Sequence, residues 1–80
     1  MNPDGPRRAA LSPKKLLLSK WTAVVPLGKQ KHFLVTAVIE PQSPGGAIEW
    51  VDLEAVLSKR VRRLRWRELT DTSVWVRGWR

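Results

Sequence analysis

KHFLVTAVIE, residues Lys31 to Glu40, is the most regular stretch of this 80-residue chain. Its apolar side chains recur at every second position, at Phe33, Val35, Ala37 and Ile39. Alternation with a period of two is typical of a strand that buries one face and exposes the other. We therefore predict a strand over residues 31–40 whose phenylalanine face points into a core.

The segments on either side of this strand carry further β signals. Residues 20–25 predict a strand ended by Pro26, and the polar, glycine-containing residues 27–30 have the length of a hairpin connection. Upstream, Ser12 followed by Pro13 favours one short helical turn with proline at its first position. Downstream, residues 41–46 contain two prolines and two adjacent glycines, which predict a turn.

The segment from residue 52 to residue 65 fits two periods. As a strand pair it reverses at Lys59 and Arg60, and residues 61–67 pair back with Leu64 and Trp66 inward. The inward face of the first strand would then be Val51, Leu53, Ala55 and Leu57. As a helix capped by Asp52 it also has one apolar stripe, formed by Leu53, Val56, Leu57, Val61 and Leu64. The β-formers of residues 47–51 favour the strand pair, and both readings stay open.

These signals predict a mostly β or small α+β fold. We expect a single small antiparallel sheet that curls into an SH3-like partial barrel, with a short helical turn and a tryptophan-rich C-terminal closure. Residues 14–80 would form one domain, and residues 1–13 a disordered basic arm with Arg7 and Arg8. A chain of this size has a marginal core, to which the large area of an indole ring contributes strongly. Of the five tryptophans, we expect Trp21, Trp50 and Trp66 in the core and Trp75 and Trp79 exposed.

Charge is concentrated at the two ends of the chain. The net charge is +8, with +4 in residues 1–20, −2 in residues 21–58 and +6 in residues 59–80. Residues 59–67 carry six positive charges and no negative one, interrupted by Val61, Leu64 and Trp66. This pattern predicts an ordered element with one face on the core and a guanidinium face directed at an anionic partner. On a strand Arg63, Arg65 and Arg67 would point outward, about 7 Å apart, which is close to the spacing of phosphates along one nucleic-acid strand.

Signals for catalysis, metals and membranes are missing from the sequence. There is no cysteine, and His32 is the single histidine, so neither a thiolate site nor a histidine cluster is available. The serines lie in no nucleophile-elbow pattern. We predict no enzyme activity, no cofactor and no bound metal. The apolar runs are too short to span a bilayer and the N-terminus has no signal-like block, so a cytoplasmic protein without a membrane partner is expected.

Two functions fit these observations. The first is a small basic module that binds nucleic acid, RNA or single strands rather than a specific duplex, because arginine binds phosphate and tryptophan stacks on unpaired bases. Its predicted binding residues are Arg60, Arg62, Arg63, Arg65, Arg67, Lys14, Lys15, Trp75 and Trp79. The second is an accessory subunit that docks on a larger acidic protein or assembly, since tryptophan and arginine are enriched at interaction hot spots. The oligomeric state is left open.

The blocks Lys14-Lys15-Leu16-Leu17, Ser19-Lys20-Trp21-Thr22-Ala23-Val24, Lys31-His32-Phe33-Leu34-Val35-Thr36, Leu53-Glu54-Ala55-Val56-Leu57-Ser58-Lys59-Arg60 and Trp66-Arg67-Glu68-Leu69, followed by Trp75 and Gly78-Trp79, carry a resemblance. In order and spacing they resemble a family of short tryptophan-rich bacterial proteins of unknown function, with members in cyanobacteria and marine proteobacteria. The resemblance covers about residues 13 to 80. It implies a single-domain, cytoplasmic bacterial protein and transfers no activity to any residue.

Overall fold

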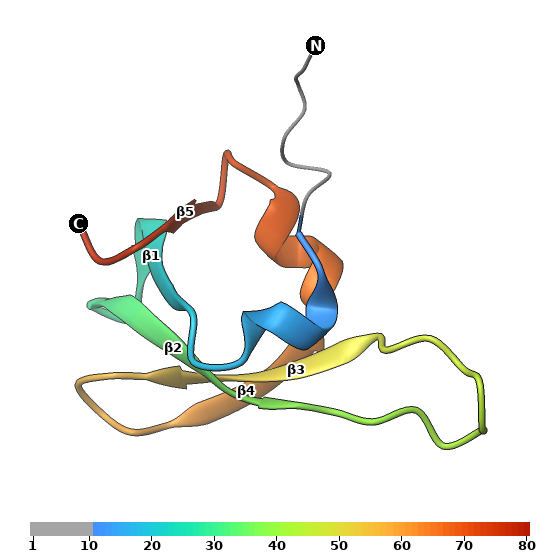
Figure 1. Ribbon diagram of the computed structural model, residues 1–80. Coiled ribbons are helices and arrows are strands. Elements are labelled where there is room, and N and C mark those ends of the chain that lie inside the picture. The colour runs from blue at the N-terminus through green and yellow to red at the C-terminus, as the bar shows by residue number, and fades with distance from the viewer. Residues whose placement is uncertain (1–10) are drawn as a thin grey trace, which may run out of the picture.

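The computed structural model describes residues 11–80, which form one antiparallel sheet with two short 3-10 turns. The strands are β1 (Lys20–Leu27), β2 (Gln30–Val38), β3 (Trp50–Ala55), β4 (Val61–Arg65) and β5 (Trp75–Arg77). The 3-10 turns are η2 (Pro13–Leu16) and η3 (Trp66–Thr70). The strand order is β4-β3-β2-β1-β5, so β4 and β5 are the two edges and the sheet is not closed (Figure 1). The predicted mostly β class with a single antiparallel sheet is confirmed.

The N-terminal end of the described chain packs against this sheet. Leu11 contacts the core, and Pro13 occupies the first position of η2, as the sequence predicts. Ser12 makes no side-chain capping bond, however, and the turn is held by its carbonyl, which accepts a bond from the Lys15 backbone N–H at 2.9 Å. Within the predicted basic arm, residues 1–10 lie outside the described part of the chain.

A tight hairpin joins β1 to β2. Gly28 and Lys29 form its two-residue loop, and both have positive φ, at 56° and 71°. Two positive φ angles match the twist of the flanking strands, which is why such loops favour glycine. β1 continues two residues past the predicted stop, through Pro26, in a part of the strand where pairing with β2 is irregular. A proline is tolerated there because no ladder bond from its nitrogen is needed.

β2 contains an irregularity that changes which of its side chains face inward. Phe33 and Val35 are buried as predicted, but the register with β3 shifts between Val35 and Ala37. Val38 therefore packs against the core, while Ala37 and Ile39 are only half-buried. The prediction of one continuous inward face up to Ile39 is wrong because a bulge moves the following residues to the other face.

The segment with two possible readings forms the strand pair, and the helical alternative is wrong. β3 and β4 pair in antiparallel register, with Asp52 opposite Arg63 and Val51 opposite Leu64. The reversal between them includes Lys59 in the left-handed region, at φ 67°. β3 ends at Ala55, so Leu57 lies in this turn with 84% of its surface exposed, contrary to its predicted inward position.

The core lies on one face of the curled sheet, which we call the inner face. Both 3-10 turns cover this face of β2, β3 and β4, and each contributes one buried leucine (Figure 1). The core residues are Leu16, Trp21, Ala23, Phe33, Val35, Val51, Leu53, Ala55, Leu64, Leu69 and Trp75. The opposite side of the sheet is the outer face, and it carries the side chains that alternate with these.

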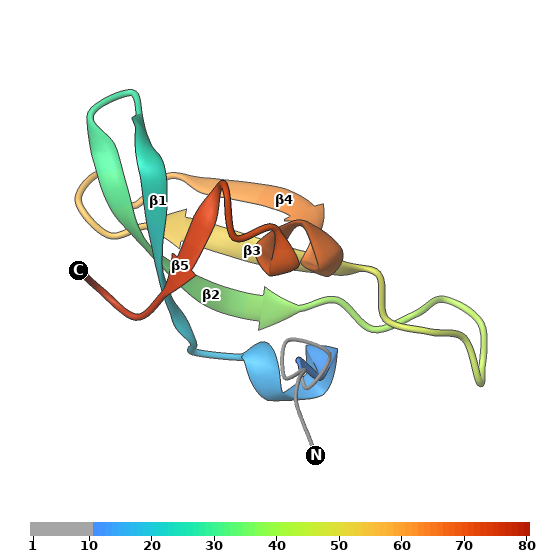
Figure 2. The same cartoon turned by 90° about the horizontal axis from the view of Figure 1, so that it is seen from above.

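The tail closes the fold by adding to the sheet. β5 pairs with β1, with Trp75 opposite Ala23, so the tail extends the sheet instead of sealing a barrel (Figure 2). Trp75 is 3% exposed and meets the Phe33 ring edge-on at 5.3 Å between centroids. Its predicted exposure is wrong, because strand alternation directs it into the core. Trp79 is 43% exposed, as predicted.

Candidate functional site

The basic run does not form one face. Arg63 and Arg65 lie on the outer face of β4, whereas Arg62 alternates to the other side and Arg60 precedes the strand. Arg67 lies in η3, because the strand ends at Arg65 and the chain turns there. The turn is held by Trp66, whose backbone N–H donates to the Glu49 carbonyl at 3.0 Å. The prediction that Arg63, Arg65 and Arg67 line one strand face is wrong for Arg67.

Carboxylates of the middle segment neutralise part of this run. Arg63 donates from Nε to Asp52 Oδ1 at 2.8 Å and from Nη2 to Oδ2 at 3.3 Å, a bidentate pair. The hydrogen bond to Asp52, followed by the carboxylate charge, raises the pKa of Arg63. Arg65 donates to Glu49 at 3.1 Å, and Lys59 lies 3.9 Å from Glu54. The mildly acidic middle of the chain thus pairs across β3 and β4 with the basic run.

Trp50 is exposed, contrary to its predicted core position. The residue is 38% exposed, and it lies on the outer face of β3 opposite Arg65, whose guanidinium carbon is 4.7 Å from the ring centroid. A cation over an indole face is attracted by the ring quadrupole. Trp66 is half-buried against the core, as predicted, and its Nε1 donates to the Ile48 carbonyl at 3.0 Å. Trp50 and Trp66 therefore differ in what they can offer a ligand.

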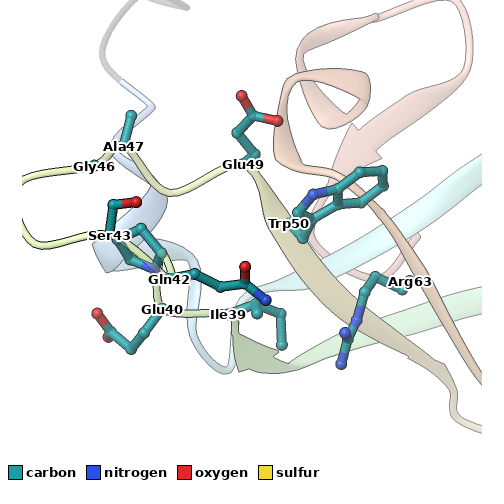
Figure 3. Close-up of a pocket in the computed structure, with 10 residues that line it drawn as sticks. Ile39, Glu40, Gln42, Ser43, Gly46, Ala47, Glu49, Trp50 and Arg63 are labelled. Carbon is teal, nitrogen blue, oxygen red and sulfur yellow. The ribbon is translucent and has the colours of Figure 1, made fainter.

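A cleft of about 690 Å³ lies beside Trp50, beneath the loop between β2 and β3. Figure 3 shows the Trp50 ring and Arg63 on the strand side of this cleft, with the side chain of the loop residue Gln42 extending toward them and the carboxylate of Glu40 directed away from them. Glu49 lines the cleft as well. Carboxylates accept N–H donors and repel anions, so the part of the cleft next to Glu49 disfavours an anionic ligand.

The second exposed indole, Trp79, is surrounded by basic groups. Its Nε1 donates to the Phe33 carbonyl at 2.9 Å, which fixes the ring on the sheet. Lys20 Nζ lies 4.9 Å from the ring centroid, and the His32 ring centroid lies at 6.0 Å. His32 Nε2 is 3.2 Å from the carbonyl oxygen of Arg80. None of the carboxylates in residues 11–80 forms an ion pair with Lys20 or Arg80.

The tail reaches this position through Gly78. This glycine has φ 90°, a left-handed conformation that other residues adopt at a cost. The Thr22 hydroxyl donates to its carbonyl at 2.6 Å and accepts from the Arg80 backbone N–H at 2.9 Å. These bonds hold the last residues of the chain across β1 on the outer face.

Apart from the buried Trp75, the remaining predicted site residues are exposed and separate from this cluster. Lys14 and Lys15 lie on η2, on the covered side of the sheet, and Arg67 lies 5.1 Å from the Trp66 ring centroid. Lys20, His32 and Trp50 are the residues that the predicted site left out. Strand alternation places Lys20 on the outer face with His32, but only the fold of the tail shows that Trp79 joins them.

Side chains that often bind metals do not gather in groups of three or more within residues 11–80. No helix of this part is long and apolar enough to cross a membrane. A family model described as "Tryptophan-rich protein (DUF2389)" matches residues 19–80, so the chain belongs to this family, whose function is unknown. Comparison with curated proteins and with solved structures yields no match.

Proposed function

We propose that this protein binds single-stranded nucleic acid, RNA or DNA, on the outer face of its sheet. The observation that carries the proposal is the position of its two most exposed tryptophans. Trp50 and Trp79 both lie on the outer face, and each has a cation within 5 Å of its ring centroid, Arg65 and Lys20 respectively. Aromatic platforms flanked by cations are what sequence-tolerant single-strand binding requires.

The cations at these rings can give up their contact with the indole and bind a phosphate when a base stacks on the ring. A base that stacks on Trp79 takes the place of the Lys20 ammonium, and the adjoining phosphate offers that ammonium a full negative charge. Stacking contributes about 1–3 kcal/mol per base. Residues 11–80 keep thirteen basic against six acidic side chains, so the internal ion pairs leave the positive net charge unchanged. This charge attracts a polyanion over the whole surface.

The small size of the helical elements favours single strands over duplex. Reading the major groove commonly uses a helix that lies along it. In residues 11–80 the longest helical element is η3, with five residues. The outer face, by contrast, offers exposed rings that an unpaired base can reach. We further propose a binding role without catalysis and a location in the bacterial cytoplasm, following the family resemblance.

Titration of the protein with a short oligouridylate and a short oligothymidylate, followed by tryptophan fluorescence, tests the proposal. Trp79→Ala should weaken binding by about ten- to a hundredfold, because it removes one stacked base. Lys20→Ala should lower the slope of log affinity against log salt by about 0.7, the value for one phosphate contact on a single strand. Lys31→Ala is the matched control, since this lysine is exposed on the opposite side of β2 from His32.

The control variant should change the slope less than Lys20→Ala, because its charge adds only to the general attraction. Arg63→Ala should also lower the slope less than Lys20→Ala, because two nitrogens of this guanidinium already bond Asp52. Binding that is equally tight in Trp79→Ala and the unchanged protein, or that shows no dependence on salt, would refute the proposal.

A second candidate function is docking on a larger acidic protein. The observation that favours it is the open edge of the sheet at β4, where Arg62, Arg63 and Arg65 are all exposed.

A further inference from the structure

The edge strand β4 has hydrogen-bonding groups that point away from the sheet. At one end of the ladder the Ala55 N–H donates to the Arg60 carbonyl at 2.8 Å, and at the other end the Trp66 N–H donates to the Glu49 carbonyl at 3.0 Å. In an antiparallel pair the residues that bond across alternate with those that do not. The backbone groups of residues 60, 62, 64 and 66 therefore face β3, and those of Val61, Arg63 and Arg65 face outward.

Arginine side chains stand on both sides of this edge. Arg63 and Arg65 project on the outer face, and Arg62 projects on the other side. The ion pairs with Asp52 and Glu49 do not use all the N–H donors of the two guanidinium groups. Arg63 uses Nε and Nη2, and Arg65 uses Nη1. Since each guanidinium has five N–H donors, both side chains can bond a second carboxylate while the first stays in place.

The charges on β4 disfavour pairing with another copy of the same strand. Two β4 strands side by side would bring arginines next to arginines, and like charges on neighbouring strands repel. Charged edges of this kind are one way in which proteins prevent edge-to-edge aggregation. The same charges attract a strand of opposite sign, so the edge discriminates between partners instead of excluding all of them.

We infer that the β4 edge binds an extended acidic segment of a partner protein, which adds to the sheet as a strand beside β4. The backbone of the segment would pair with the outward N–H and C=O groups of Val61, Arg63 and Arg65. Its carboxylates would bond the arginines on both sides. Main-chain pairing supplies affinity in such strand addition, and the flanking side chains supply specificity. The inference deepens the docking function proposed as the second candidate and does not depend on nucleic-acid binding.

A labelled peptide of about ten residues, the length of a long strand, with glutamate and threonine alternating, is the probe. Two control peptides separate the contributions. The first has lysine in place of every glutamate. The second keeps every glutamate and carries N-methyl groups on alternate backbone nitrogens, which removes strand pairing without changing charge. The glutamate peptide should bind about tenfold or more tighter than either control.

Val61→Pro tests the edge on the protein side without altering its charge. The Val61 N–H points outward and its side chain is exposed, so proline removes an edge donor and no bond to β3. Val61→Thr is the matched control, since it keeps both the N–H and a strand-forming side chain. Peptide binding should be lost in Val61→Pro and kept in Val61→Thr.

Amide hydrogen exchange on the unchanged protein gives a readout that is independent of any variant. In the free protein the amides of Val61, Arg63 and Arg65 should exchange faster than those of Arg62 and Leu64. The bound glutamate peptide should slow the first three by about tenfold or more and change the other two little. Uniform protection of all five would mean a general change in stability and would overturn the inference.

Several other results would overturn it. These are the absence of binding by the glutamate peptide, equal binding by the N-methylated peptide, and equal binding by the lysine peptide. If Val61→Pro does not fold, the comparison of peptides on the unchanged protein decides the matter. Trp79→Ala should bind the peptide normally and Val61→Pro should bind oligouridylate normally, so failure of one proposal is distinguishable from failure of the other.

Discussion

Replacement of Trp75 by alanine should destabilise this fold more than replacement of Trp79 by alanine, although the sequence predicts both tryptophans to be exposed. Trp75 is 3% exposed, packs edge-on against Phe33 and lies where β5 joins β1. Truncating a buried tryptophan to alanine costs about 3–5 kcal/mol, from lost burial and from the cavity left behind. A domain of about 70 residues has a total stability of roughly 3.5–10 kcal/mol. Trp75→Ala therefore removes a large part of the stability, or all of it.

Thermal unfolding followed by far-UV circular dichroism measures this effect. In a domain of this size, 1 kcal/mol shifts the melting temperature by about 4–8 °C, so Trp75→Ala should lower it by about 12–40 °C or leave no transition. Trp79→Ala is the matched control. Its half-exposed ring loses one hydrogen bond, to the Phe33 carbonyl, at a cost of about 0.5–1.5 kcal/mol, together with limited burial. Trp75→Phe should lie between the two.

The reasoning would be refuted if Trp75→Ala melted within a few degrees of the unchanged protein, or if Trp79→Ala were the more destabilised variant. Either result would mean that β5 contributes little to the core. The pairing of Trp75 with Ala23 would then not hold in solution.

Two further predictions concern charged groups. Asp52→Asn should release the Arg63 guanidinium, and so tighten binding to oligouridylate and raise the salt slope by up to about 0.7; an unchanged slope would show that Arg63 is not within reach of the ligand. The Ser73 hydroxyl and then its backbone N–H donate to Asp71 and lower the pKa of this carboxyl. A lowered folded-state pKa stabilises the protein at pH values above the ordinary aspartate value of about 3.9, and this contribution is lost as pH falls through the lowered pKa. The difference in melting temperature between Asp71→Asn and the unchanged protein should therefore be constant near neutral pH and shrink below about pH 4; a difference that does not vary with pH would contradict the assignment.

Local sequence patterns were sufficient to predict an element where the residues that determine its structure lie within one short stretch. The alternation in residues 31–40 predicts β2, because a strand with one buried face needs apolar side chains at every second position. Gly28 marks the hairpin turn, and Pro13 marks the first position of η2. Past Val35 the alternation no longer predicts which side chains face inward, because a bulge shifts the register there and no residue type in the sequence marks it.

Residues 52–65 show where local pattern stops being sufficient. Their apolar side chains satisfy a helical stripe and a strand face about equally, so propensity cannot separate the two. The structure selects the strand pair, in which Val51 and Leu53 meet β2 on one side and Leu64 meets them from the other. Those neighbours lie on other strands, outside the stretch whose pattern is read, and their contribution to burial exceeds the small differences in intrinsic preference.

By itself the sequence determined the β class, the positive charge and its concentration at the two ends, and the dependence of a small core on tryptophan. The charge and the tryptophan content are counts over the sequence, and the β class follows from the period of the apolar residues within short stretches. Only the tertiary structure decided which indoles are buried and which arginines are neutralised. The pairing of β5 with β1 buries Trp75, and the register of β3 and β4 places Asp52 opposite Arg63. The physical reason is that a shift of one residue in either register would turn every side chain to the other face of the sheet. Register is set by the geometry of the turn between β3 and β4, and by contacts between distant segments where β5 joins β1.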